Sequence, residues 1–113
     1  MQKSSIEIFF GMDTELSEWE AINKEWRSDV YVLYNGVLFK VNVYTPVRLV
    51  QDFNTELKEY GFYSIDENIV ISKSTDKNTI IELILKLQGE GYFDKIKPLS
   101  NNETGLLVKV YWN

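Results

Sequence analysis

The sequence predicts an α+β fold: a mixed, largely antiparallel sheet of about five strands with two helices packed on one face. An Asn-Gly pair divides two strand-like runs in the first half of the chain. Two later stretches repeat apolar residues every three or four positions, which is the spacing of an amphipathic helix. The 113 residues contain no internal repeat and no linker-like tract, so we expect a single domain over residues 1–113.

The first strand is expected in the apolar run near the start of the chain, Ile6 to Phe10. Glu7 interrupts this run, which is too short for the core of a secretory signal, so the mature chain is expected to begin here. No uncharged apolar stretch approaches the roughly 20 residues that a membrane helix needs. We therefore expect a soluble, cytoplasmic protein with no membrane partner.

The next segment is strongly acidic. Seven of the first 29 residues are acids and three are bases, whereas the rest of the chain carries ten acids and nine bases. Two of the three tryptophans, Trp19 and Trp26, lie in the same segment. Such a segment suits a surface that meets a basic protein, because charge steers the encounter and tryptophan anchors the contact. The other interpretation is a short helix whose acids face water and whose apolar side packs on the sheet through Leu16, Trp19, Ile22 and Trp26.

A hairpin is expected from Asp29 to Tyr44, because Asn35-Gly36 accepts the positive φ angles of a type I′ turn. A two-residue loop fixes the cross-strand partners, and every second residue then shares a face. The face predicted to be core carries Val30, Val32, Tyr34, Val37, Phe39, Val41 and Val43. The other face is more polar and keeps enough apolar area to be partly covered or to bind a ligand.

The first helix is expected from Pro46 to Tyr60, with Thr45 as its cap, proline in its first turn and Gly61 as its stop. Its apolar stripe comprises Val47, Val50, Phe53, Leu57 and Tyr60. A break at Asn54-Thr55 is the alternative, because both residues form helix weakly.

A short buried strand is expected at Ile69-Val70-Ile71. The Ser74-Thr75-Asp76 cluster then offers caps for a second helix that ends at Gly89 and buries Ile80, Leu83, Ile84 and Leu87. A loop is expected from Gly91 to Asn102, and a final strand from Leu106 to Trp112.

The chain contains no histidine and no cysteine. Their absence excludes imidazole bases, Ser-His and Cys-His nucleophiles, disulfides and the usual zinc sites. The glycines form no phosphate-binding loop, and neither Asp13-Thr14-Glu15 nor Asp66-Glu67 has the spacing of an EF-hand. The net charge of −5 disfavours nucleic acid. We therefore expect no cofactor, no metal and no nucleic-acid partner.

The run from Val37 to Leu49, an apolar strand that leads into a Thr-Pro helix start, resembles bacterial immunity protein family 8. The family pattern continues with a short strand, here Ile69 to Ile71, and a second helix that ends near an aromatic pair, here Tyr92-Phe93. The resemblance covers about residues 30–93. It implies the fold of a small α+β domain.

The resemblance also implies a function. It implies a non-enzymatic inhibitor that binds and neutralises a cognate toxin domain of a polymorphic-toxin or contact-dependent inhibition system. Such toxins are often nucleases with basic clefts, which an acidic, aromatic-bearing surface complements. The candidate toxin-facing residues are Asp13, Glu15, Glu18, Trp19, Glu20 and Glu25, whereas Trp26 is expected in the core.

Two other functions stay open. The first is an enzyme or small-ligand binder with a pocket near the sheet that uses Tyr31, Tyr44 and Arg48. The second is an assembly subunit that dimerises through the edge of the strand from Leu106 to Trp112. The oligomeric state does not follow from the sequence.

Overall fold

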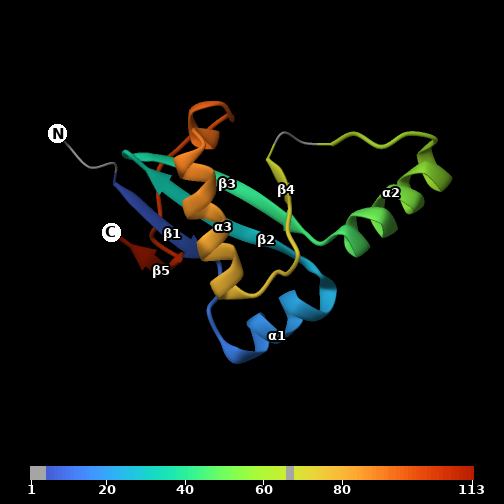
Figure 1. Cartoon of the computed structure of the whole chain (residues 1–113), viewed down its shortest axis with the longest axis horizontal. Helices are drawn as coiled ribbons and strands as arrows, with labels where there is room; N and C mark the ends of the chain where they lie inside the picture. Colours follow the sequence, from blue (N-terminus) through green and yellow to red (C-terminus); the bar gives the residue numbers. More distant parts are fainter. Residues whose placement is uncertain (1–4, 66–67) are drawn as a thin grey trace.

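The computed structural model describes residues 5–65 and 68–113. The predicted α+β class and the mixed five-stranded sheet are confirmed, and the described part of the chain holds three α-helices where two were expected. Figure 1 shows their arrangement. The elements in chain order are β1 (Ile6–Phe10), α1 (Glu15–Lys24), β2 (Trp26–Tyr34), β3 (Val37–Tyr44), α2 (Pro46–Tyr60), β4 (Ile69–Ile71), α3 (Lys77–Gly89), the 3-10 turn η1 (Tyr92–Asp94) and β5 (Val108–Trp112).

The strands lie in the order β4-β3-β2-β1-β5. Only the β3–β4 pairing is parallel; the other three are antiparallel. A parallel pair needs a long crossover, and α2 with the segment after it forms that connection. The sheet is therefore mixed and largely antiparallel, as predicted.

The hairpin forms as expected. Asn35 and Gly36 have φ angles of 50° and 82°, as a type I′ turn requires, and Val32 pairs with Phe39 in the predicted register. β2 begins at Trp26, three residues before the predicted start, because a bulge between Arg27 and Val30 lets the strand continue past the irregularity.

The core lies between the sheet and α3. Ile80 and Ile84 of α3 are completely buried, and η1 adds Phe93 against the ring of Phe39, with centroids 5.4 Å apart. Leu83 and Leu87, also predicted to be buried, are partly buried at the edges of this contact. On the sheet, the buried face consists of Ile6, Ile8, Phe10, Val30, Val32, Phe39, Val41 and Val43.

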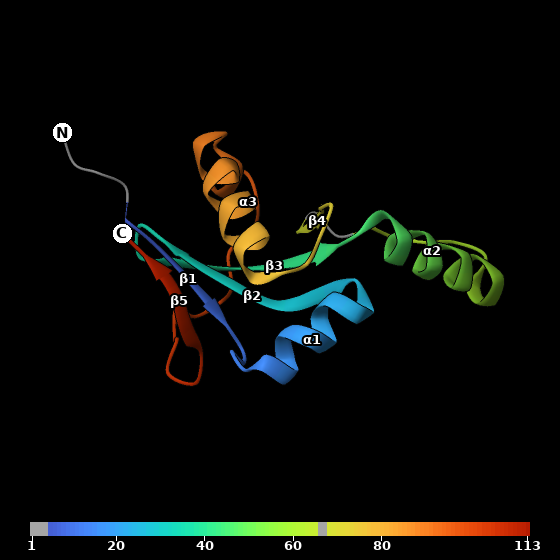
Figure 2. The ribbon, with the colours of Figure 1, turned by 60° about the horizontal axis from the view of Figure 1, so that its bottom comes forward.

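The expectation that two helices pack on one face of the sheet is wrong. α2 has the predicted bounds and no break, because Thr45 accepts a hydrogen bond from the Arg48 amide at 3.4 Å and Gly61 ends the helix at φ 82°. Yet α2 contains no buried residue. It extends past the end of the sheet, away from α3, so that the molecule measures 50 × 32 × 24 Å (Figures 1 and 2).

Two strand predictions are also corrected. β4 is an edge strand that is only half-buried, with Ile71 43% exposed, because a single neighbour covers it. β5 begins at Val108, since Leu106 is almost fully exposed. A register shift opposite β1 places both Val110 and Tyr111 against the core, which a simple alternation does not allow.

Candidate protein-binding surface on α1

The acidic segment folds into α1 because its ends are capped by its own residues. The Thr14 hydroxyl accepts a hydrogen bond from the Ser17 amide at 3.0 Å, and the Ser17 hydroxyl accepts one from the Thr14 amide at 2.9 Å. At the other end Glu25 adopts a left-handed conformation with φ 56° and donates its amide to the Ala21 and Ile22 carbonyls. Glu15 and Glu18 in the first turn also suit the positive end of the helix dipole.

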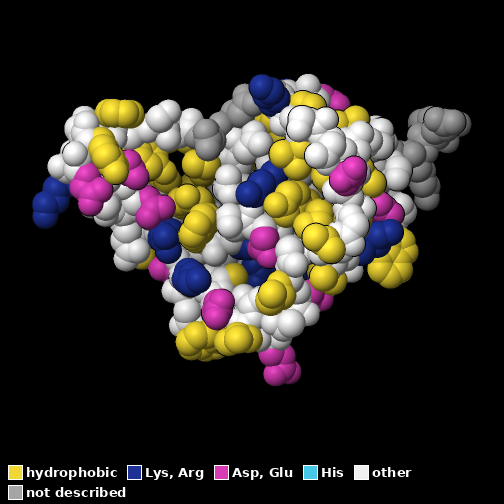
Figure 3. All heavy atoms as spheres, turned by 180° about the vertical axis from the view of Figure 1, so that it is seen from behind, with side chains coloured by type: hydrophobic (Ala, Val, Ile, Leu, Met, Phe, Trp, Pro, Cys, Tyr) yellow, Lys and Arg dark blue, Asp and Glu magenta, His cyan; other side chains and the backbone are white. Residues whose placement is uncertain are grey.

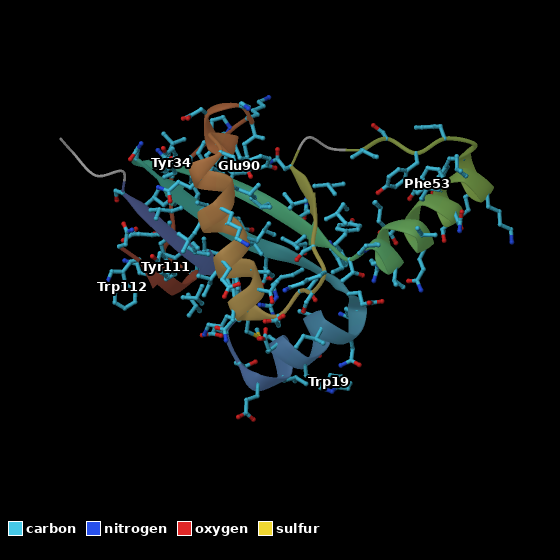
Figure 4. All side chains as sticks on the ribbon, viewed as in Figure 1. Trp19, Tyr34, Phe53, Glu90, Tyr111 and Trp112 are labelled. Atoms are coloured by element: carbon cyan, nitrogen blue, oxygen red, sulfur yellow. The ribbon has the colours of Figure 1, made fainter. Side chains whose placement is uncertain are left out.

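The apolar stripe of α1 faces solvent. Leu16, Trp19 and Ile22 are 65%, 62% and 44% exposed, whereas Ala21 is the buried residue of this helix. The interpretation in which this stripe packs the helix onto the sheet is therefore wrong for these three side chains. Trp19 projects from the lower end of the molecule (Figure 4), and hydrophobic and acidic side chains lie side by side there in the space-filling view (Figure 3).

Polar contacts, and not the apolar stripe, hold α1 in place. Glu18 forms an ion pair with Arg27, which is 4% exposed and stacks over the Phe10 ring at 4.5 Å. The other oxygen of Glu18 accepts a hydrogen bond from the Lys77 amide, the first residue of α3, at 2.9 Å. The Thr75 hydroxyl donates to the Ala21 carbonyl at 2.8 Å. These bonds fix α1 to β2 and to the start of α3.

The structure brings together four of the six candidate residues. Asp13, Glu15, Glu18 and Trp19 line one shallow depression of about 490 Å³, together with Ile22 and Lys77. Within it the Lys77 ammonium forms an ion pair with Asp13 at 2.9 Å. Two of the acids, Asp13 and Glu18, are thus engaged by the protein itself.

The other two candidates lie elsewhere. Glu20 is exposed on a different side of α1, where it lines a second depression of about 240 Å³ with Lys24, Arg27 and Asp29. Glu25 is half-buried at the end of the helix, where its carbonyl accepts a hydrogen bond from the Thr45 amide at 3.0 Å. Glu25 does not line the depression that contains Trp19. Glu15 and Glu20 make no ion pair within the described part of the chain.

Sequence reasoning missed Lys77 and Arg27. Lys77 joins the rim of the depression from 59 positions beyond Glu18, and Arg27 pairs with Glu18 only because β2 runs beneath α1. Neither residue carries a local signal for these contacts. Their positions follow from the topology of the sheet.

Trp26 is half-buried and only partly fulfils its expected role in the core. Its ring lies 5.8 Å from that of Tyr44, and the Arg48 guanidinium stacks over it at 4.9 Å. Burial, followed by the negative charge of Asp52, raises the pKa of the Tyr44 phenol above its usual range. The phenol therefore stays neutral at physiological pH, and the cluster is an apolar and cationic contact at the base of α2.

The residues considered for a ligand pocket do not converge. Tyr44 and Arg48 pack on Trp26, whereas Tyr31 lines a separate depression of about 340 Å³ beneath the C-terminal loop, with Leu38 and Leu107. Among residues 5–65 and 68–113 no three acidic side chains are grouped as a metal site. The Asp66-Glu67 pair lies outside the described residues.

Comparison with known proteins adds no assignment. No family model, no curated protein and no solved structure matches the chain. In the described residues, none of the helices combines the length and the apolar character that crossing a bilayer requires. The exposed, acidic and aromatic face of α1 is thus the feature from which a function can be inferred.

Proposed function

We propose that this protein is an immunity protein that binds and neutralises a cognate bacterial toxin domain through α1. The observation that carries the proposal is Trp19: this residue is 62% exposed on a well-anchored helix and stands among carboxylates. A large exposed aromatic on a fixed element is the usual anchor of a protein interface. The resemblance of the region from Val37 to Leu49 to an immunity protein family supports the same role.

We call the side chains that are proposed to contact the toxin domain the α1 surface. Leu16, Trp19 and Ile22 supply apolar area, and Glu15 and Glu20 supply charge at the two sides of the helix. Asp13 lies at the rim, where the Lys77 ammonium offsets its charge. Glu18 supports the surface from beneath, because Arg27 and the Lys77 amide already occupy its oxygens. The α1 surface therefore comprises Asp13, Glu15, Leu16, Trp19, Glu20 and Ile22.

The charge of the α1 surface indicates the chemistry of the partner. α1 itself has three acids and one base, so it attracts a basic surface and repels an acidic one. The active-site cleft of a nuclease is basic because it binds phosphate. A nuclease toxin domain in the cytoplasm of the producing cell is the partner that we propose, with Trp19 buried at the centre of the contact and the acids at its rim.

Co-purification with a toxin tests this function. The protein would be captured on the toxin domain encoded beside it, at low and at high salt, and growth of cells that express the toxin would be scored in parallel. We expect Trp19→Ala to weaken binding by about 2 kcal/mol or more, in the range of an interface hot spot. We expect the double change Glu15→Lys and Glu20→Lys to slow association and to abolish protection.

The matched control changes the same number of charges away from α1. Glu90 and Glu103 are both exposed, and Glu90 lies at the opposite end of the molecule from Trp19 (Figure 4). Glu90→Lys with Glu103→Lys should leave binding and protection intact. Equal loss of toxin binding by both double variants would mean that only the net charge matters. Unchanged binding by Trp19→Ala would mean that the contact lies away from α1.

A further inference from the structure

The apolar side of α2 is largely uncovered in the described structure, apart from the Phe53 ring, which lies edge-on to Tyr63 with centroids 5.7 Å apart. Five side chains, called here the α2 stripe, recur on one side of this helix, and they are between 39% and 64% exposed. Hydrophobic side chains gather over α2 at the left of the space-filling view (Figure 3). The α2 stripe consists of Val47, Val50, Phe53, Leu57 and Tyr60.

This exposure is unusual for the length and character of the helix. An isolated helix of about 15 residues is marginal in water, and an amphipathic helix normally gains its stability by packing its apolar side. The contacts of α2 with the rest of the described chain include two at its first turn and one ring pair: Arg48 stacks over the Trp26 ring and donates to the Lys24 carbonyl, and Phe53 contacts Tyr63. These contacts position α2 but leave the stripe open to solvent.

Charge distinguishes the α2 stripe from the α1 surface. The residues that border the stripe on the solvent side are Asn54 and Lys58, and the whole helix holds two bases and three acids, of which Arg48 and Asp52 pair with each other. A nearly neutral apolar stripe offers nothing to steer a strongly basic protein. It suits another nearly neutral apolar surface, and α2 of a second molecule is such a surface.

The spacing of the stripe is also self-complementary. Phe53 is the central residue of α2, and the other four side chains are placed almost symmetrically about it. If two copies pack their α2 helices antiparallel, Phe53 meets Phe53, Val50 meets Leu57, and Val47 meets Tyr60. A two-fold symmetric contact requires this kind of match, because the same patch serves both partners.

We propose that α2 is a homodimerisation helix, and that the α2 stripes of two copies pack antiparallel across a two-fold axis. The area sets the strength of this contact. Given about 150–250 Å² for a fully buried aromatic side chain, the exposed parts of the stripe amount to roughly 400 Å² per copy. Stable interfaces bury about 800 Å² per partner. We therefore expect a weak dimer that forms only as the protein concentration rises.

Sedimentation velocity over a series from low to high micromolar concentration measures this equilibrium. We expect the wild type to shift from monomer toward dimer, and Val50→Glu to remain monomeric because two like charges would meet an apolar surface. Gln51→Glu adds the same charge one residue away, about 100° around the helix, and should dimerise as the wild type does. Unchanged circular dichroism spectra would show that both variants are folded.

A cysteine pair locates the contact. The chain has no cysteine of its own, so a single introduced thiol reports one position. Asn54 and Thr55 are both exposed neighbours, but only Asn54 borders the stripe near its centre. Under mild oxidation we expect Asn54→Cys to form a covalent dimer at least tenfold faster than Thr55→Cys.

Three outcomes overturn the proposal. They are a wild type that is monomeric at every concentration, equal dimerisation by Val50→Glu and Gln51→Glu, and equal cross-linking at the two cysteine positions. If Val50→Glu lost toxin binding while the wild type stayed monomeric, the α2 stripe would belong to the toxin, and the homodimer would be excluded. The proposed immunity function is tested independently by the α1 variants.

Discussion

The Glu18 carboxylate holds α1 through two partners, and one of them is a buried charge. Arg27 is 4% exposed, and one nitrogen of its guanidinium, Nη1, has no hydrogen-bond partner among the described residues. Glu18 is therefore the counter-charge on which the burial of Arg27 depends. Removal of one member of a buried ion pair is costly because the other charge is left without compensation.

We expect Glu18→Gln to lower the free energy of unfolding by about 1–3 kcal/mol, less than for a fully buried pair because Glu18 is 32% exposed. Urea unfolding measures the loss. Glu15→Gln, on the same helix but exposed, is the control and should change stability by less than about 0.5 kcal/mol. Equal effects of the two substitutions would contradict the structural role of Glu18 and return it to the toxin-facing set.

The Asp76 carboxylate caps α3 and makes stability depend on pH. It accepts hydrogen bonds from the Ser74 hydroxyl and, at 3.1 Å, from the Thr79 amide. The Ser74 hydrogen bond is the largest cause that lowers the pKa of Asp76 from its ordinary value of 3.8; partial burial opposes it, and the bonds from Thr79 add to it. A lowered pKa in the folded state contributes stability above pH 3.8, and that stability is lost as the pH falls below this value.

Asp76→Asn keeps a capping oxygen but removes the charge. We expect this variant to be less stable than the wild type by about 1 kcal/mol at neutral pH, and the difference to shrink as the pH falls below 3.8. Thermal unfolding across this range measures both values. A difference for Asp76→Asn that is constant with pH would contradict the assignment.

For single elements, the sequence correctly predicts the turns and helix ends that are determined by residues close together in the chain. The Asn35-Gly36 turn fixes the hairpin register because few residues accept its φ angles. The ends of α2 are also fixed locally, by Thr45 and Pro46 at its start and by Gly61 at its end, because caps act within one turn of the helix. These features are confirmed to the residue, with the exception of the early start of β2 at its bulge.

The same local signals do not show what covers an apolar stripe. α1 and α2 both have the expected periodicity, and packing on the sheet was expected for α2 and considered for α1. In the structure α3 covers the core face of the sheet, and both stripes are largely exposed. The bulge in β5 is a second example, because its position depends on how β5 pairs with β1 about 100 residues earlier.

The candidate site also has features that could be predicted from the sequence and features that could not. The acidic composition and the presence of Trp19 in the acidic segment could be inferred from the sequence, because charge density and residue type are local properties. The exposure of Trp19 could not, since the sequence also allowed this residue to pack on the sheet. The internal use of Glu18 could not, since its partners Arg27 and Lys77 are brought to it by β2 and α3. The sequence therefore predicts the chemistry of the α1 surface better than it predicts which residues belong to that surface.

The whole molecule combines one well-packed body with two exposed helices that are anchored differently. The body consists of β1, β2, β3 and α3 around the buried cluster. α1 is tied to this body by an ion pair and by hydrogen bonds to β2 and the start of α3. α2 contacts the rest of the described chain mainly near its base, where Arg48 stacks over Trp26 and donates to the Lys24 carbonyl, and through the Phe53–Tyr63 ring pair.

Hydrogen exchange distinguishes these three parts, because local opening free energies fall where few buried contacts hold an element. At low protein concentration we expect amides of β2 and α3 to exchange slowest, those of α1 at an intermediate rate, and those of α2 fastest. Homodimerisation through the α2 stripe would slow exchange in α2 as the concentration rises and leave α1 unchanged, whereas a bound toxin domain would slow exchange in α1. The variants Val50→Glu and Gln51→Glu provide the comparison, since only the second should keep the concentration effect. If α2 of the dilute wild type were protected as strongly as α3, the helix would be stable within a single molecule, and its exposed stripe would need no second copy to account for it.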